Sequence, residues 1–198
     1  GQLLVGDFQN ALVVRVFLET INGEDQGAVF PFLNGFRSGV NRLSYGPNGR
    51  LYVGGLQRTW ASIAPDPASF ERVTFEGKTP FSILKAEVKT DGFLLTFTEP
   101  ARPSAAAPDN FDVSQFSYAY HPDYGSPRFN HAGEKDSQTP IEVTDVTLSA
   151  NRLELRLSLN GWREGHVTQV RCYDVMSEAG KALWHDTFHY TLNQIPRP

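Results

Sequence analysis

The chain has 198 residues, a net charge of −4, 40% hydrophobic residues and a single cysteine. This composition supports folded cores and argues against a disordered chain, while the acidic balance without any basic run argues against a nucleic-acid partner. No apolar stretch approaches the roughly 20 residues needed to cross a bilayer, so no membrane span is expected. The length is compatible with one large or two small domains, and we expect two.

The first ten residues of the chain return 48 positions later. GQLLVGDFQN at residues 1–10 aligns with GRLYVGGLQR at residues 49–58, with identities at the Gly, Leu, Val, Gly and Gln positions. A period in the forties, built from short apolar strands between glycines, is typical of a β-propeller blade. Because the chain opens inside the first copy and has no initiator Met, we expect it to be the last part of a longer protein.

Apolar and polar residues alternate in the first part of the chain, which predicts a meander of short strands. The alternating runs cover residues 3–8, 11–18, 28–32, 40–45, 51–55 and 70–75. The GPNG sequence at 46–49 supplies the Pro and Gly that a tight turn needs, so it should close a hairpin between the fourth and fifth runs. We assign residues 1–78 to about one and a half terminal blades of a β-propeller.

A second alternating set begins after Thr79-Pro80, where the repeat ends. Its seven runs cover residues 82–89, 92–98, 111–120, 141–148, 152–159, 166–175 and 186–192. Seven strands over about 120 residues, separated by turn residues, predict an immunoglobulin-like or fibronectin-like β-sandwich over residues 79–198. One helical turn is expected within residues 104–110. The predicted fold class is therefore all-β, a partial propeller followed by an Ig-like sandwich.

Three segments carry a family resemblance: SGVNRLSYGPNGRLYVGGLQRTW, GKTPFSILKAEVKTDGFLLTFTEPA and FHYTLN. Together they resemble the carboxyl-terminal part of the sorbosone/glucose-dehydrogenase-like propeller proteins, in which an Ig-like domain follows a propeller. The resemblance implies a periplasmic or extracellular oxidoreductase of the quinoprotein sugar or alcohol dehydrogenase type. It also implies that the complete propeller would hold pyrroloquinoline quinone (PQQ) and calcium at its centre.

Residues at such a centre come from several blades, and most of those blades are absent from this sequence. The resemblance therefore implies that this chain is non-catalytic when isolated, binds no cofactor alone, and completes or supports a propeller. The expected partner is the amino-terminal propeller portion or another subunit.

The candidates for cofactor binding are the residues that follow the repeated glycines in the second copy, because inner propeller strands end at the central channel. These residues are Gln57, Arg58 and Trp60. The planar fork of Arg58 could clamp a carboxylate of a quinone, and Trp60 could stack on a ring. The alternative is structural: Arg58 would pair with an acid between blades, and Trp60 would pack under a loop.

A second cluster is aromatic and lies in the Pro- and Gly-broken stretch FSYAYHPDYGSPRFNH at 116–131. Its candidate ligand-binding residues are Tyr118, Tyr120, His121 and Tyr124. Aromatic faces beside polar groups suit the apolar face and hydroxylated rim of a sugar. They support an alternative function, a carbohydrate- or cell-surface-binding β module without redox activity. The structural alternative is that the tyrosines anchor a long loop.

No catalytic residue and no metal ligand is assigned from the sequence. No GxSxG elbow, phosphate loop or HExxH motif occurs. His185 and His189 alternate along a predicted strand, which puts them about 13 Å apart and beyond the reach of one zinc ion. Cys172 lies in an alternating apolar run and is expected to be a buried, inert thiol. A hydrolase with dispersed acids remains a third alternative, since sequence spacing cannot place two carboxylates together.

Overall fold

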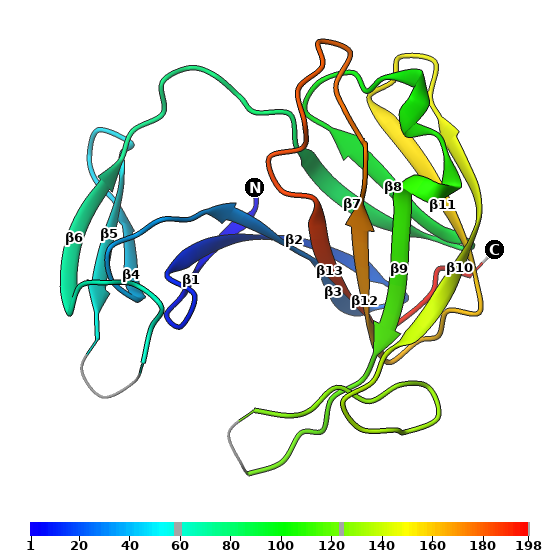
Figure 1. Ribbon diagram of the computed structural model, residues 1–198, viewed down its shortest axis with the longest axis horizontal. Helices are drawn as coiled ribbons and strands as arrows, with labels where there is room; N and C mark the ends of the chain where they lie inside the picture. Colours follow the sequence, from blue (N-terminus) through cyan, green and yellow to red (C-terminus); the bar gives the residue numbers. More distant parts are fainter. Residues whose placement is uncertain (58–60, 123–124, 198) are drawn as a thin grey trace. The chain divides into compact units, whose positions relative to one another are not determined.

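The computed structural model describes residues 1–57, 61–122 and 125–197, and these residues form an all-β fold (Figure 1). This confirms the predicted all-β class. The described part of the chain contains strands and two short 3₁₀ turns but no α-helix. The first six strands are β1 (Leu3–Asp7), β2 (Leu12–Ile21), β3 (Glu24–Leu33), β4 (Val40–Tyr45), β5 (Leu51–Leu56) and β6 (Ala68–Val73).

The remaining strands are β7 (Ile83–Lys89), β8 (Gly92–Phe97), β9 (Phe111–Phe116), β10 (Thr139–Leu148), β11 (Glu154–Asn160), β12 (His166–Cys172) and β13 (Thr187–Leu192). The chain divides into two compact units, which are described separately. The first holds residues 1–16 and 29–79, and the second holds residues 17–28 together with the chain from Pro80 onward. The β2–β3 hairpin thus contributes to both units.

In the first unit, strands β4, β5 and β6 form a three-stranded antiparallel sheet, and β1 pairs with β2. One apolar cluster joins the two sets of strands, with Val13 on β2, Val40 on β4 and Val53 on β5 at its centre. Glycine allows the strands to approach closely, because a Cβ atom on Gly6 would lie 2.5 Å from Cγ1 of Val40. The internal repeat therefore corresponds to two strands, β1 and β5, that pack around a shared core.

The GPNG turn closes the β4–β5 hairpin as predicted. The backbone N–H of Gly49 donates to Gly46 O at 3.0 Å, and the N–H of Gly46 donates to Arg50 O at 2.9 Å. Gly49 has a φ of 72°, a conformation that glycine adopts without a steric penalty. The turn residues read from the sequence therefore account for the register of this hairpin.

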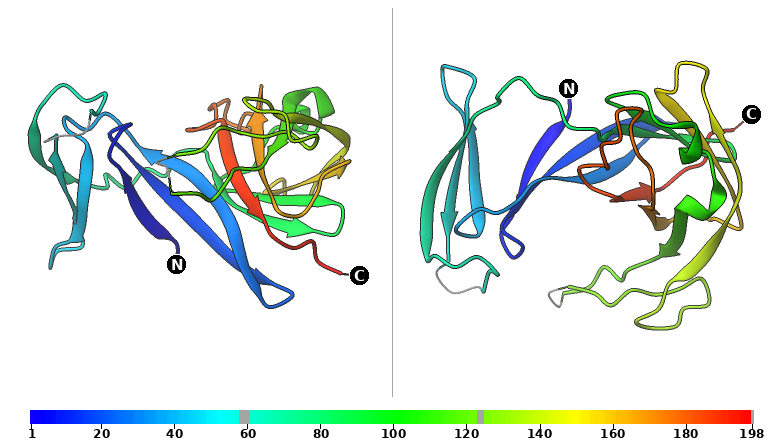
Figure 2. Two further views of the ribbon diagram at one scale, coloured as in Figure 1. Left: turned by 90° about the horizontal axis from the view of Figure 1, so that it is seen from below. Right: turned by 45° about the horizontal axis from the view of Figure 1, so that its top comes forward.

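The second unit contains the strand order β13-β12-β9-β10-β11-β8-β7, and every pair in it is antiparallel. β3 lies beside β13 at one end of this order. These strands belong to one curled sheet (Figures 1 and 2). The curl brings Phe93 on β8 against Phe188 and Tyr190 on β13, with ring centroids 6.2 and 4.9 Å apart, and the core of this unit lies inside the curl.

Two details of the second unit differ from the sequence-based expectation. The strand expected over residues 111–120 ends at Phe116, because Ser117 turns away and pairs with Phe129 instead. The single helical turn expected within 104–110 is a pair of 3₁₀ turns, Pro103–Ala105 and Pro108–Asn110. Each begins with proline, whose fixed φ and missing N–H suit the first position of a turn.

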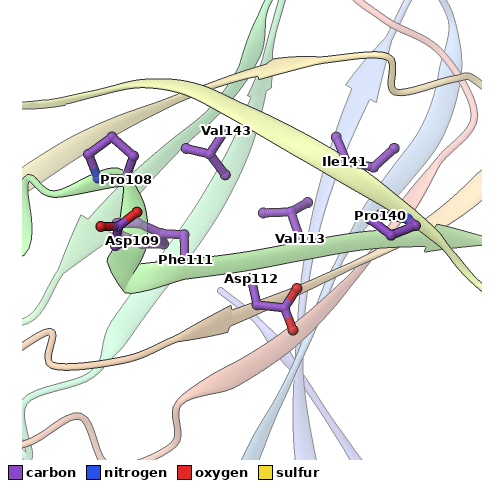
Figure 3. A pocket seen from close by; sticks show the side chains of 8 residues that line it. All are labelled: Pro108, Asp109, Phe111, Asp112, Val113, Pro140, Ile141 and Val143. Atoms are coloured by element: carbon purple, nitrogen blue, oxygen red, sulfur yellow. The ribbon is translucent and has the colours of Figure 1, made fainter.

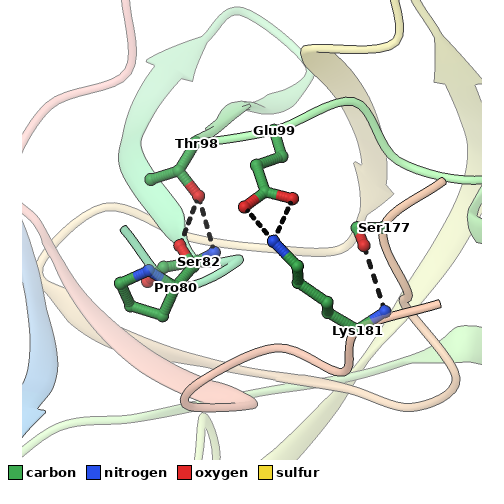
Figure 4. A network of polar contacts seen from close by, with 6 residues as sticks. All are labelled: Pro80, Ser82, Thr98, Glu99, Ser177 and Lys181. Atoms are coloured by element: carbon green, nitrogen blue, oxygen red, sulfur yellow. Dashed lines mark hydrogen bonds and ion pairs between the residues drawn. The ribbon is translucent and has the colours of Figure 1, made fainter. Parts of the chain in front are cut away.

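Polar contacts connect the residues that follow β8 with the segment before β7 and with Lys181 (Figure 4). The hydroxyl of Thr98 donates to Pro80 O at 2.7 Å and accepts the backbone N–H of Ser82 at 2.9 Å. Nearby, the ammonium group of Lys181 lies 2.6 and 2.9 Å from the two carboxylate oxygens of Glu99. Pro80 and Ser82, just before β7, are thereby tied to Thr98, just after β8.

The tip of the β2–β3 hairpin docks onto β13 through a buried glutamine. Gln26 is 3% exposed, and its Oε1 accepts the backbone N–H groups of Asn193 and Gln194 at 2.9 and 2.7 Å. Its Nε2 donates to the hydroxyl of Tyr190 and to Gln194 O, both at 2.9 Å. The Tyr190 hydroxyl in turn donates to Glu19 at 2.7 Å. Every polar atom of the Gln26 amide is therefore satisfied inside the protein.

Replacing Gln26 by alanine should destabilise the protein by about 3 kcal/mol, because it leaves the partly buried N–H groups of Asn193 and Gln194 without an acceptor and removes the partner of the Tyr190 hydroxyl. The free energy of unfolding from urea titration measures this loss. Glu24→Gln, an exposed change on the same strand, is the matched control and should stay within about 0.5 kcal/mol of wild type. Equal stability of the two variants would show that this docking contact contributes little.

Candidate functional site

Gln57 is the one predicted cofactor-binding residue among the described residues, and it closes a loop. Its Nε2 donates to Ala64 O at 2.6 Å, and its backbone N–H donates to Pro67 O at 2.7 Å. Arg58 and Trp60 lie outside the described residues. The structure therefore gives Gln57 a role in holding the chain between β5 and β6, and the cofactor role stays a prediction.

The described aromatic residues of the second candidate site lie on the surface just after β9. Tyr118 is 59% exposed, Tyr120 is fully exposed, and His121 is also exposed. Tyr124 lies outside the described residues. The base of this loop is held by two backbone hydrogen bonds between Ser117 and Phe129, at 2.8 and 2.9 Å. Two tyrosine rings are thus presented to solvent beside a fixed loop base.

A buried glutamine and a histidine pair form a polar cluster that the sequence analysis missed. Gln115 on β9 is fully buried, and its Oε1 accepts the backbone N–H of Arg163 at 2.8 Å and Nε2 of His131 at 3.0 Å. Because this oxygen can only accept, His131 carries its proton on Nε2. The His131 ring lies 4.7 Å from the ring of His166. Burial lowers the pKa of His131, and the nearby His166 and Arg163 lower it further.

A second cluster lies on the outer face of β12 and β13. Oε1 of Gln169 accepts from Nη1 of Arg128 and from Nε2 of His189, both at 3.1 Å. The Arg128 guanidinium sits over the ring of Phe116, 4.2 Å from its centroid. Burial lowers the pKa of His189, and the charge of Arg128 adds to this effect. Both clusters fasten the loop between β9 and β10 to the sheet.

One sequence signal could have revealed the first cluster. Gln115 follows Phe111 and Val113 on the face of β9 that points into the core. A polar residue at an apolar position must find hydrogen-bond partners when it is buried. The identity of those partners has no local signature, since Arg163 and Thr168 lie far along the chain.

Among the residues that the structure describes, no group of three His, Cys, Asp or Glu side chains could hold a metal ion. Cys172 is buried, as expected, and burial raises the pKa of its thiol to about 12. A thiol with such a pKa remains protonated near neutral pH and is a poor nucleophile. Within the described ranges, no helix is long and apolar enough to span a membrane.

A concavity of about 390 Å³ lies between β9 and β10 (Figure 3). Its apolar floor contains Val113, Ile141 and Val143, and two carboxylates, Asp109 and Asp112, lie along its β9 side. A second concavity of about 320 Å³ is polar and includes Arg128 and Asp136. Both lie beside the loop that joins β9 to β10.

Comparison with family models, with curated proteins and with solved structures found no match for this chain.

The partly buried histidines His131 and His189 predict an acid-sensitive fold. Their lowered pKa values mean that the unfolded chain binds protons more readily, since its histidines titrate near the ordinary 6.5. The stability they contribute is complete above pH 6.5 and is lost as the pH falls from 6.5 through the lowered pKa. We therefore expect the melting temperature to drop between pH 7.5 and pH 5.

The variant His189→Gln tests whether His189 contributes to the acid sensitivity, because glutamine can still donate to Gln169 but does not titrate. Its melting temperature should fall less than that of wild type over the same pH interval. His185→Gln, the same substitution outside both glutamine clusters, is the control and should show the wild-type drop. An identical acid-induced drop in wild type and His189→Gln would contradict the role of His189.

Proposed function

We propose that the chain is the C-terminal, non-catalytic segment of a secreted propeller oxidoreductase resembling the quinoprotein sugar and alcohol dehydrogenases. In this proposal residues 1–78 complete a propeller, and the following Ig-like sandwich supports or docks it. The single observation that carries the proposal is the difference between the two copies of the internal repeat.

The two repeat copies have different strand neighbours. β5 in the second copy lies between β4 and β6, whereas β1 in the first copy pairs only with β2 among the described strands. When the two copies of the repeat are aligned, β1 corresponds to β5. The open edge of β1 then corresponds to the edge of β5 that pairs with β4. Leu3 and Val5 on β1 are 56% and 47% exposed. An open strand edge with exposed apolar side chains is a ready site for a further strand.

The strand order of the second unit supports the Ig-like part of the proposal. The order β7-β8-β11-β10 followed by β9-β12-β13 is that of strands A-B-E-D and C-F-G in an immunoglobulin domain. β10 pairs with β9 over residues 139–141 and with β11 over residues 142–148, so it links these two sets of strands. With one cysteine, the chain replaces the inter-sheet disulfide of antibody domains by aromatic packing around Phe93.

The cofactor belongs to the complete propeller in this proposal. Among the described residues, Nε2 of Gln57 already donates to Ala64 O. PQQ and calcium would be held mainly by other blades. This chain would contribute at most Gln57, Arg58 and Trp60 at the end of one inner strand.

The open edge of β1 can be tested with a surrogate strand. A peptide with the sequence of residues 38–48 reproduces β4 and should pair with β1 as β4 pairs with β5. Adding it to the isotopically labelled chain should slow hydrogen exchange at alternate β1 amides by about tenfold, because those amides become hydrogen-bonded. Nuclear magnetic resonance measures this exchange residue by residue.

The control peptide carries proline in place of Arg42 and Ser44, whose N–H groups face the partner strand in the same register as that of Gly46, so it loses two ladder donors and cannot pair. It should leave exchange at β1 unchanged. The variant Leu3→Lys/Val5→Lys should also weaken the effect of the native peptide, since edge lysines oppose strand addition. Unchanged β1 exchange with the native peptide, or equal protection by both peptides, would argue against the proposal.

The exposed tyrosines support a second candidate function, carbohydrate or cell-surface binding without redox activity. Tyr118 and Tyr120 present open aromatic faces, which favour stacking on a sugar ring. In this case the variant Tyr118→Ala/Tyr120→Ala should abolish binding to a glycan array. Tyr45→Ala, another exposed tyrosine, is the control and should leave binding intact. Binding that survives the double substitution would exclude this surface as the sugar site.

A further inference from the structure

The two copies of the internal repeat pack against each other through opposite faces. Leu4 on β1 and Val13 on β2 belong to the apolar cluster that also holds Leu51 and Val53 on β5. In the repeat, Leu51 aligns with Leu3, one residue before Leu4. Because successive side chains of a strand point to opposite faces of its sheet, these positions lie on opposite faces of the repeat. The first copy therefore buries one face, and the second copy buries the other.

The strand registers extend this correspondence to the next strand of each copy. Gly6 pairs with Val13, and Gly54, which aligns with Gly6, pairs with Phe70. Phe70 on β6 is therefore the counterpart of Val13 on β2. Val13 is 0% exposed, whereas Phe70 is 78% exposed. The face that the first copy buries against the second is thus open to solvent in the second copy.

The opposite face is open in the first copy. Leu51 and Val53 are 6% and 1% exposed in the second copy, while their counterparts Leu3 and Val5 are 56% and 47% exposed. The first unit therefore exposes two sheet faces, and each corresponds to a face that is buried inside the same unit. Repeat proteins stack when the open face of one repeat fits the open face of the next, so these two faces are suited to each other.

The open face of the β4–β5–β6 sheet is aromatic and positively charged. The ring of Phe70 stacks on Tyr52, with centroids 5.7 Å apart and an interplanar angle of 14°. Arg42 and Arg72 lie on the same face, because they pair with Gly54 and Tyr52. Both arginines are exposed, and neither forms an ion pair with an acid of the described residues. We call this surface the aromatic face.

The open face of the β1–β2 hairpin is aliphatic and carries a negative charge. Leu3 and Val5 each lie directly opposite a valine on β2. The face ends at Asp7, whose carboxylate accepts hydrogen bonds from Asn10 but forms no ion pair with a basic side chain of the described residues. We call this surface the aliphatic face. The two faces therefore match in both apolar character and charge.

We propose that a second copy of this chain docks with its aliphatic face on the aromatic face of the first. The contact repeats between two chains the packing that joins the two repeat copies within one chain. Asp7 and the two arginines have opposite charges, which favours this orientation. Such a head-to-tail contact leaves one face of each kind free, so further copies add until a ring closes. The inference rests on the internal repeat and stands or falls separately from the proposed oxidoreductase function.

Sedimentation velocity of the purified full chain, from micromolar to near-millimolar concentrations, tests the proposal. Wild type should form species larger than a dimer as its concentration rises. Phe70→Arg places a cation in the aromatic face, and Leu3→Lys/Val5→Lys places two cations in the aliphatic face. Each variant alone should raise the dissociation constant at least about tenfold, because every contact then includes one altered face. Melting temperatures near that of wild type will show that both variants fold.

An equimolar mixture of the two variants separates this contact from other modes of association. It should form a dimer and nothing larger, since the mixture offers one intact face of each kind and they can meet only once. Phe75→Arg, a change at another exposed phenylalanine of the same unit, is the control and should associate like wild type. A wild-type chain that stays monomeric would overturn the proposal, as would association that survives Phe70→Arg or a mixture that remains monomeric.

Discussion

Pairing of strand edges is the constraint on which this structure depends. A strand edge exposes N–H and C=O groups that must bond to another strand, a side chain or water. The second unit meets this demand in two ways: β10 divides its pairs between β9 and β11, and the β2–β3 hairpin lies beside β13. The buried amide of Gln26 fixes the hairpin by satisfying the backbone of Asn193 and Gln194.

The same constraint locates the strand edge that we connect with function. β1 keeps an open edge and exposes two aliphatic side chains, which is the basis for proposing that a further strand joins it. The divergence of β10 from β9 opens a concavity of about 390 Å³ beside the loop that joins these two strands.

Much of the fold was predictable from local sequence. Alternation and turn residues placed most strands within a few residues, and the GPNG motif predicted the β4–β5 hairpin. The predicted end of β9 was wrong, because the alternation of residue types continues through Tyr118 and Tyr120 although the backbone leaves the β9 ladder after Phe116. The docking of Gln26 onto Tyr190 could not be predicted, since the two residues are 164 positions apart and no local pattern links them. The glutamine–histidine clusters escaped the sequence analysis for the same reason.

Native mass spectrometry of the chain purified from its source tests the central claim most directly. The account predicts that the 22.1 kDa chain travels with a polypeptide whose sequence contains further propeller blades, released from it only under denaturing conditions. That polypeptide would pair with the open edge of β1. A 22.1 kDa chain that is alone and monomeric at all concentrations would contradict the account, because the edge would then need no partner strand.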